Sequence, residues 1–224
     1  MNAATWTAVD SYLNGLLVPR DDALDAALAA SAEAGLPAIA VSPLQGRMLQ
    51  LFARMMAARA ILEIGTLGGY STICLARALP ADGKVVTLEL EPRHAEVARR
   101  NFARAGLAEK IEVRVGRALG SLTMLAAEKA GPFDLIFIDA DKAGIPEYFD
   151  WSLKLARPGT AIVVDNVVRK GEVADAASTD VAVRGVRRFN EMLAKERRVT
   201  ATTIQTVGSK GYDGFTLAIV DAVA

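Results

Sequence analysis

The stretch ILEIGTLGGYST, residues 61–72, decides the fold of this chain, because a short apolar run leads directly into a turn with three glycines within five residues. Glycine lets a ligand approach the backbone, and a helix that begins there offers free N–H groups. The stretch is therefore typical of nucleotide-binding α/β proteins, although a plain strand–helix turn remains the alternative. Leu67 and Tyr70 stand where G-x-G-x-x-G has glycine, which disfavours a dinucleotide pyrophosphate.

Beyond this stretch, apolar β-runs alternate with segments of helical length. The predicted strands are residues 60–64, 84–90, 110–115, 133–139 and 160–165. The predicted helices between them are residues 70–79, 92–105, 118–130 and 145–156. Strands separated by helices predict a parallel sheet with helices on both faces.

Both ends of the chain depart from this alternation. Three helices are predicted first, over residues 5–16, 21–34 and 43–55. A helix over 180–195 precedes two β-runs, 199–206 and 214–220, and the glycine-rich loop between these runs indicates a hairpin that closes the sheet with an antiparallel strand. We expect one domain over residues 1–224, in which a helical extension (1–58) serves as a lid or dimer arm for an α/β core (59–224).

The composition excludes several classes of protein. The chain has 224 residues, 52% of them hydrophobic and 23% charged, as in an ordinary globular enzyme. Lys+Arg and Asp+Glu are equal at 26 each, so no overall field favours nucleic acid or an anionic membrane, although a local basic patch stays open. One cysteine, Cys74, no signal-peptide pattern and no apolar run of ~20 residues predict a cytoplasmic protein without a membrane span.

Two acidic residues near the glycine turn indicate a nucleoside-bearing ligand. In a parallel sheet, ligands bind beyond the carboxyl ends of the strands. Glu89 ends the second strand about 20 residues after the turn, where an acid typically binds ribose hydroxyls. Glu63 stands inside an apolar strand and needs a cationic or hydrogen-bond-donating partner.

Candidate metal ligands with side-chain oxygens follow the fourth and fifth predicted strands. Asp139 and Asp141 end the fourth strand, and Asp165 and Asn166 end the fifth. Either pair alone is usually a turn, but carboxylates and an amide on neighbouring strand ends are the ligands that Mg²⁺ prefers. The single cysteine and single histidine leave no soft-metal alternative.

Two residues are candidates for a general base. His94 lies at a predicted helix start and is expected to be a solvated surface residue. Lys142 follows the Asp139 strand end, and a divalent cation beside it would make its amine lose a proton more readily. Lys142 is therefore the better candidate.

Four motifs in this order and spacing, EIGTLGGYS, TLELEP, FIDADK and VVDNVV, resemble the cation-dependent class I O-methyltransferases that use S-adenosylmethionine (SAM). These include catechol O-methyltransferase and, more closely, the caffeoyl-CoA O-methyltransferases and their bacterial relatives. The resemblance covers roughly residues 40–220. It implies a Rossmann-like fold, with helices on both faces of a mostly parallel seven-stranded sheet whose last strand is antiparallel, and a homodimer.

The resemblance also implies a role for each site residue. The SAM-binding positions are Val41, Glu63, Gly65, Thr66, Ser71, Glu89, Ala118, Asp139 and Asp141, with Arg117 beside the adenine. Asp139, Asp165 and Asn166 would hold Mg²⁺ or another divalent cation, and Lys142 would be the general base. Asp141, which residue chemistry alone places among possible metal ligands, is assigned to the cofactor by the resemblance.

The implied reaction transfers a methyl group from SAM to a hydroxyl of a catechol-like vicinal diol, such as caffeoyl-CoA or another small phenol. An alternative acceptor is a hydroxylated uridine in tRNA, for which the basic residues would be Arg184, Arg187, Arg188, Arg197 and Arg198. A nicotinamide-dependent oxidoreductase or a non-catalytic nucleotide-binding module is a third hypothesis. The altered glycine spacing and the metal-type residues argue against it.

The chain departs from the family pattern near the acceptor. Ala140 and Asp141 stand where the animal catechol enzymes have His-Trp, and Lys170 stands roughly where the plant enzymes have a substrate-contacting asparagine. Residues 168–179 are polar and are expected to be irregular, mobile and to cover the acceptor. The sequence therefore does not identify the acceptor.

Overall fold

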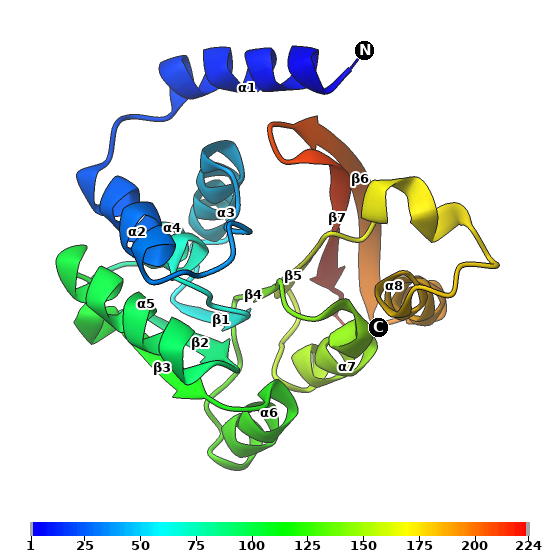
Figure 1. Cartoon of the computed structure of the whole chain (residues 1–224). Coiled ribbons are helices and arrows are strands. Elements are labelled where there is room, and N and C mark those ends of the chain that lie inside the picture. Colours follow the sequence, from blue (N-terminus) through cyan, green and yellow to red (C-terminus); the bar gives the residue numbers. More distant parts are fainter. Residues whose placement is uncertain (1, 223–224) are drawn as a thin grey trace.

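A seven-stranded sheet forms the centre of the computed structural model, which describes residues 2–222 (Figure 1). Its strands are β1 (Ala60–Ile64), β2 (Lys84–Glu89), β3 (Ile111–Val115), β4 (Leu135–Ile138), β5 (Ala161–Asp165), β6 (Val199–Gly208) and β7 (Gly211–Val220). Their order is β3-β2-β1-β4-β5-β7-β6. Strands β1 to β5 pair in parallel, whereas β7 is antiparallel to both β5 and β6, which confirms the predicted sheet.

The helices cover both faces of this sheet. They are α1 (Ala3–Leu17), α2 (Asp22–Glu33), α3 (Pro43–Met55), α4 (Tyr70–Ala76), α5 (Pro92–Arg104), α6 (Ala118–Ala127), α7 (Ile145–Lys154) and α8 (Val181–Leu193). Three short 3₁₀ turns accompany them: η1 (Ala108–Lys110), η2 (Lys142–Gly144) and η3 (Arg169–Ala174). Ser42 and Gln45 form a capping box at the start of α3, where Pro43 occupies the first helical position, as the sequence predicts.

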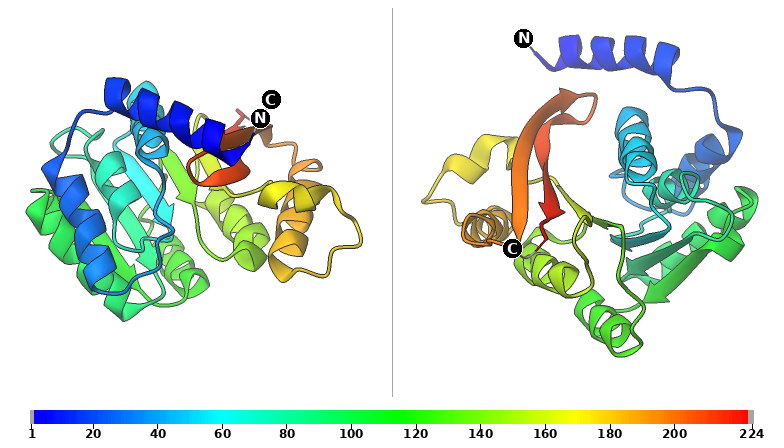
Figure 2. Two further views of the ribbon diagram at one scale, coloured as in Figure 1. Left: turned by 45° about the horizontal axis from the view of Figure 1, so that its top comes forward. Right: turned by 180° about the vertical axis from the view of Figure 1, so that it is seen from behind.

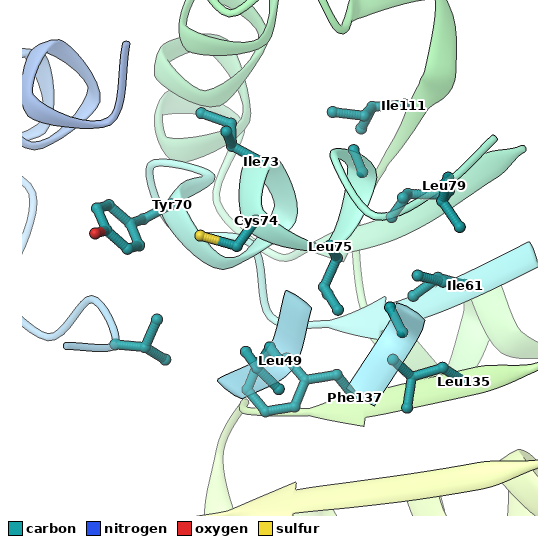
Figure 3. Close-up of a cluster of buried hydrophobic side chains, with 14 of the residues drawn as sticks. Leu49, Ile61, Tyr70, Ile73, Cys74, Leu75, Leu79, Ile111, Leu135 and Phe137 are labelled. Carbon is teal, nitrogen blue, oxygen red and sulfur yellow. The ribbon is translucent and has the colours of Figure 1, made fainter. Parts of the chain in front are cut away.

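The core consists of two apolar layers, one on each face of the sheet. Alternate residues of a strand point to opposite faces, so Ile61 joins the layer under α2 to α5, whereas Leu62 joins the layer under α6 to α8. Figure 3 shows part of the first layer, where Leu49 of α3 and Leu75 of α4 lie beside strand residues such as Ile61. These layers fix the strand ends that carry the site.

Helix α1 lies on the outside of the molecule, beside the tip of the β6–β7 hairpin (Figures 1 and 2). Its Asp10 carboxylate accepts a hydrogen bond from the backbone N–H of Ser209 at 2.7 Å. No residue of α1 is buried. The helix therefore contributes little to the core of a single chain.

Two predicted segments differ from the structure. The loop expected at 207–213 is shorter, because β6 and β7 extend to Gly208 and Gly211. The segment 168–179, expected to be irregular, contains η3, which is held against β7 and α8; Lys170 and Gly171 within η3 are not helical, and residues 175–179 are irregular as expected. In residues 2–222 no helix combines the length and apolar character that crossing a membrane requires.

Candidate active site

The glycine turn after β1 lies where the strand order reverses, since β2 and β3 extend the sheet on one side of β1, and β4 and β5 on the other. Gly65 has φ 104°, and a Cβ on this residue would lie 2.1 Å from the backbone carbonyl oxygen of Asp139. Only glycine fits this position. The turn is therefore packed directly against the end of β4, at the crevice where open α/β sheets bind their ligands.

Glu63 is completely buried beneath this turn. Its carboxylate accepts hydrogen bonds from the hydroxyls of Ser71 (2.6 Å), Thr72 and Thr87 (2.6 Å). Burial raises the pKa of Glu63 from 4.5 to about 7, although the three hydroxyls favour the charged form. The expectation that Glu63 needs a hydrogen-bond donor is confirmed, and the Thr87 hydroxyl also lies 2.6 Å from that of Thr66.

Glu89, at the end of β2, holds the other side of the turn. Its Oε2 accepts hydrogen bonds from the backbone N–H groups of Thr66 (3.2 Å) and Leu67 (2.7 Å). His94 Nδ1 lies 3.4 Å from Glu89 Oε1 with a side chain 23% exposed, so the expectation of a solvated surface histidine is wrong. Ala118 begins α6 just beyond β3, on the same edge of the sheet as Glu89.

Asp139 and Asp165 come together at the ends of β4 and β5. These strands are parallel neighbours whose register pairs Ile138 with Val164, so the following residues reach the same level of the sheet. Lys142 Nζ donates to Asp139 Oδ1 at 2.8 Å, and the Lys142 side chain is only 10% exposed. Asn166 follows Asp165 directly, in a left-handed conformation with φ 58°.

The chemistry of this donor set fits a hard divalent cation. Asp165 is 5% exposed, and burial together with the charge of Asp139 raises its carboxyl pKa well above the usual range. A bound cation would relieve this unfavourable charge. Within residues 2–222 there is no group of three or more His, Cys, Asp or Glu side chains that could hold a metal, and the Asp139, Asp165 and Asn166 set offers only two carboxylates and an amide.

Asp141 is engaged away from this pair. Its carboxylate accepts hydrogen bonds from the backbone N–H of Gly144 (2.9 Å) and from the hydroxyl of Tyr148 on α7. The structure thus places Asp141 at the start of η2. Tyr148 was not among the predicted site residues, and its only signal in the sequence was a tyrosine one turn into a helix that follows the FIDADK motif.

Val41 and Asp165 line the same small pocket. Val41 precedes α3, and the pocket is also lined by Gln45 of that helix and the aromatic rings of Phe137 and Phe215. Gln45 and Phe215 were not among the predicted site residues. The end of β5 is therefore bordered by apolar side chains.

The segment after β5 has a strained backbone. Asn166, Arg169 and Lys170 adopt φ values of 58°, 54° and 58°, in the left-handed region that favours glycine. The Asp213 carboxylate on β7 accepts hydrogen bonds from the N–H groups of Val168 (2.9 Å) and Arg169 (3.0 Å). Contacts from other elements therefore hold this segment in place.

Three of the five candidate arginines for tRNA binding already have partners. Arg187 donates to the Val173 carbonyl oxygen at 2.6 Å, Arg188 to Glu147 at 2.7 Å, and Arg198 to Glu196 at 2.7 Å. Arg188 and Arg198 thereby form ion pairs with Glu147 and Glu196, whereas Arg187 contacts a neutral carbonyl oxygen. The arginine cluster is therefore a weak candidate for a nucleic-acid surface.

Comparison with known proteins identifies the type of enzyme. A family model described as O-methyltransferase matches residues 20–219. The chain is 56% identical to a catechol O-methyltransferase of Niastella koreensis, over 98% of this chain and 100% of the relative. It is 54% identical to a catechol O-methyltransferase of Mycobacterium tuberculosis, over 95% and 94% of the two chains.

Solved structures show the same similarity. An O-methyltransferase of Bacillus cereus in complex with SAH superposes with a TM-score of 0.97 at 57% identity, over 98% of this chain and 100% of that one. An O-methyltransferase of Streptomyces achromogenes involved in tomaymycin synthesis, in complex with SAM, superposes with a TM-score of 0.96 at 55% identity, over 99% and 100%. These similarities confirm the Rossmann-like methyltransferase fold that the motifs predict.

Proposed function

The chain belongs to the O-methyltransferase family and is a SAM-dependent O-methyltransferase, and from this premise we propose that it methylates one hydroxyl of a catechol-like vicinal diol with the help of Mg²⁺ or another divalent cation. The observation that carries the proposal is the convergence of Asp139 and Asp165 on neighbouring strand ends, with the Lys142 amine 2.8 Å from Asp139. The catechol O-methyltransferase names of two relatives support a small phenolic acceptor.

In this proposal each residue of the chain has a defined task. Asp139, Asp165 and Asn166 would hold the cation, and the cation would supply a Lewis acid that makes a neighbouring hydroxyl easier to deprotonate. Lys142, whose amine lies 2.8 Å from Asp139, would accept the hydroxyl proton as the general base. The acceptor oxygen then forms a bond to the methyl carbon of SAM as the carbon–sulfur bond breaks.

The cofactor would lie along the glycine turn. We propose that Gly65, Thr66, Ser71 and Val41 surround its methionine end, with Glu63 supporting them from below. Glu89 would bind the ribose hydroxyls, because it ends β2 at the ligand-binding edge of the sheet, where an acid typically takes them. Ala118 and Arg117 would lie against the adenine, and Asp141 would border the cofactor from η2.

We also propose that the protein is a homodimer that works in the cytoplasm. Helix α1 has no buried residue in the single chain, while its Tyr12 and Leu16 are 67% and 65% exposed and Met55 on α3 is 80% exposed. A second copy would cover these apolar side chains. Light scattering on the purified protein measures the oligomeric state, and a monomer at micromolar concentration contradicts the dimer.

The test of the proposed function is methyl transfer from labelled SAM to caffeoyl-CoA, caffeic acid and simple catechols. We expect transfer with Mg²⁺, loss of transfer with EDTA, and recovery when Mg²⁺ is returned. Lys142→Ala should lower kcat by roughly 10²- to 10⁴-fold, the usual contribution of a general base, while SAM affinity measured by calorimetry stays unchanged.

The matched control is Lys195→Ala, which removes an exposed lysine after α8, outside the proposed site. Phenols with a single hydroxyl should not be methylated. Transfer that persists in EDTA contradicts the cation-dependent mechanism. Failure with every catechol despite SAM binding contradicts the phenolic acceptor, and tRNA, with salt-dependent binding as the readout, is then the next acceptor to test.

A further inference from the structure

Helix α8 touches the backbone of η2, the turn that carries Lys142, at Gly185. A Cβ on Gly185 would lie 2.2 Å from the carbonyl oxygen of Lys142 and 2.7 Å from Cα of Ala143. Both contacts are backbone atoms, so no side-chain rotation could relieve them. Glycine is unfavourable inside a helix relative to alanine, so the close approach, rather than helix formation, accounts for glycine at this position.

Two contacts hold α8 against α7. The rings of Phe189 and Phe149 meet edge to face, with centroids 5.3 Å apart and planes at 73°. Arg188 of α8 donates to the Glu147 carboxylate of α7 at 2.7 Å. Because Phe189 and Phe149 are fully buried, α8 cannot move away from η2 without opening the core.

The opposite side of η2 is held by α7. Asp141, just before the turn, accepts hydrogen bonds from the Gly144 N–H and from the Tyr148 hydroxyl. A Cβ on Gly144 would lie 2.6 Å from the Tyr148 ring, so this contact is also close. The turn is therefore held between α7 and α8, and the Lys142 side chain leaves it toward Asp139.

We propose that Gly185 is a positioning residue for methyl transfer: it lets α8 support the backbone of η2 and thereby sets where the Lys142 amine stands relative to the acceptor hydroxyl. The proposal rests on the proposed role of Lys142 as general base. Gly185 itself touches neither substrate nor cofactor. Its influence runs entirely through the Lys142 and Ala143 backbone.

The test is a double-mutant cycle of Gly185→Ala and Lys142→Ala, with catechol as acceptor and saturating Mg²⁺. We expect Gly185→Ala to lower kcat roughly 10- to 100-fold, because a small displacement of a reacting group has an effect of that size. SAM affinity measured by calorimetry should stay unchanged. In the Lys142→Ala background, Gly185→Ala should have no further effect, because the base that it positions is already missing.

Hydrogen exchange gives a readout independent of activity. Peptides covering residues 142–147 should exchange faster in Gly185→Ala than in the unmodified protein. The matched control is Gly15→Ala, also within a helix, where a Cβ would meet nothing within 4 Å. It should leave kcat and the exchange at residues 142–147 unchanged.

The possible outcomes separate the two proposals. A folded Gly185→Ala protein with unchanged kcat, or a loss that adds fully to that of Lys142→Ala, overturns the positioning role alone. Lys142→Ala with unchanged kcat overturns the general base and the positioning role together. If Gly185→Ala does not fold, Phe189→Leu replaces it in the same cycle, because it loosens α8 against α7 and should show the same dependence on Lys142.

Discussion

The turn after β1 and the turn after β5 both carry left-handed residues at the ligand-binding edge of the sheet, but they use different residue types. In the first turn, Gly65 and Gly69 take two of the left-handed positions, with φ of 104° and 86°, and Leu67 takes a third with φ 51°. In the second turn, three residues with side chains are left-handed before Gly171: Asn166, Arg169 and Lys170. Such a conformation costs about 1–2 kcal/mol for Arg169 or Lys170, less for Asn166, and little for glycine.

The two turns also differ in how they are held. Buried carboxylates of the sheet itself, Glu63 and Glu89, bind the first turn from below. The second is held from outside, by Asp213 of the neighbouring hairpin and Arg187 of α8. The first turn is thus fixed by the sheet, whereas the second depends on contacts that single substitutions can remove.

The largest effect should come from breaking the first turn with Gly65→Ala. The new Cβ would overlap the Asp139 carbonyl oxygen 2.1 Å away, in a conformation that alanine rarely adopts. We expect a loss of about 4 kcal/mol in the free energy of unfolding, measured in urea, together with loss of SAM binding. Gly106→Ala, at φ 70° with nothing within 4 Å, isolates the backbone strain and should lose only about 1–2 kcal/mol.

A second way to sharpen the comparison is to measure how the contribution of Glu63 to the free energy of unfolding depends on pH. The folded state keeps its proton up to about pH 7, whereas the unfolded chain releases it near the ordinary pKa of 4.5. The folded state therefore binds more protons between these values, so this group's contribution to stability is fully present below pH 4.5 and falls as pH rises to about 7. The total change is roughly 3 kcal/mol.

Glu63→Gln should remove this dependence. Urea unfolding at several pH values in EDTA would show stability falling less steeply with pH in the variant than in the unmodified protein. Glu96→Gln, an exposed glutamate whose side chain is 69% accessible, serves as the control and should leave the slope as it is. Equal slopes of stability against pH in all three proteins would mean that the Glu63 carboxyl loses its proton at the same pH in the folded and unfolded states, which contradicts the raised pKa.

A smaller effect should follow from releasing the second turn with Asp213→Ala. The backbone N–H groups of Val168 and Arg169 lose their acceptor, at a cost of about 1–3 kcal/mol. We expect the acceptor KM to rise while SAM affinity stays unchanged, because the glycine turn is not touched. Asp213→Asn keeps an oxygen acceptor and should restore most of the loss; equal damage to SAM binding would show that the two turns are coupled.

The smallest effect should be a gain in the free energy of unfolding from Lys170→Gly. Glycine relieves the left-handed strain, but it also makes the unfolded chain more flexible, so the net gain is at most about 0.5 kcal/mol. Lys170→Ala keeps the strain and should not be stabilising. A clear loss with glycine in thermal unfolding would mean that the exposed Lys170 side chain makes contacts that offset its strain.

The sequence predicted the regular parts of the molecule because they follow from local patterns. Alternation of β-runs and helices placed Asp139 and Asp165 at neighbouring strand ends, and the glycine spacing marked the turn before α4. The need of Glu63 for a hydrogen-bond donor also followed from its place in an apolar strand, but its partner Thr87, which lies opposite it in the β1–β2 register, was not predicted.

The supporting residues could not be predicted in this way. Tyr148, Gly185 and Asp213 act through contacts between segments whose relative positions depend on how helices and the hairpin pack. Gly185 is 43 positions after Lys142, and nothing in the spacing of α8 marks a close backbone approach. The conformation of the second turn could not be predicted for the same reason. Its left-handed residues are not glycines, and residues distant in the sequence hold them in place.

The bond from Asp213 to the turn after β5 has a consequence for engineering. The turn after β5, which is expected to cover the acceptor, depends on two separate pieces of sequence, because residues 168–169 and Asp213 stand 45 and 44 positions apart yet are joined by hydrogen bonds. Transplanting residues 166–180 from a relative to change substrate range would bring a new loop without its anchor. A successful graft must carry position 213 with it, so libraries that vary both pieces together should yield more folded variants than libraries confined to the loop.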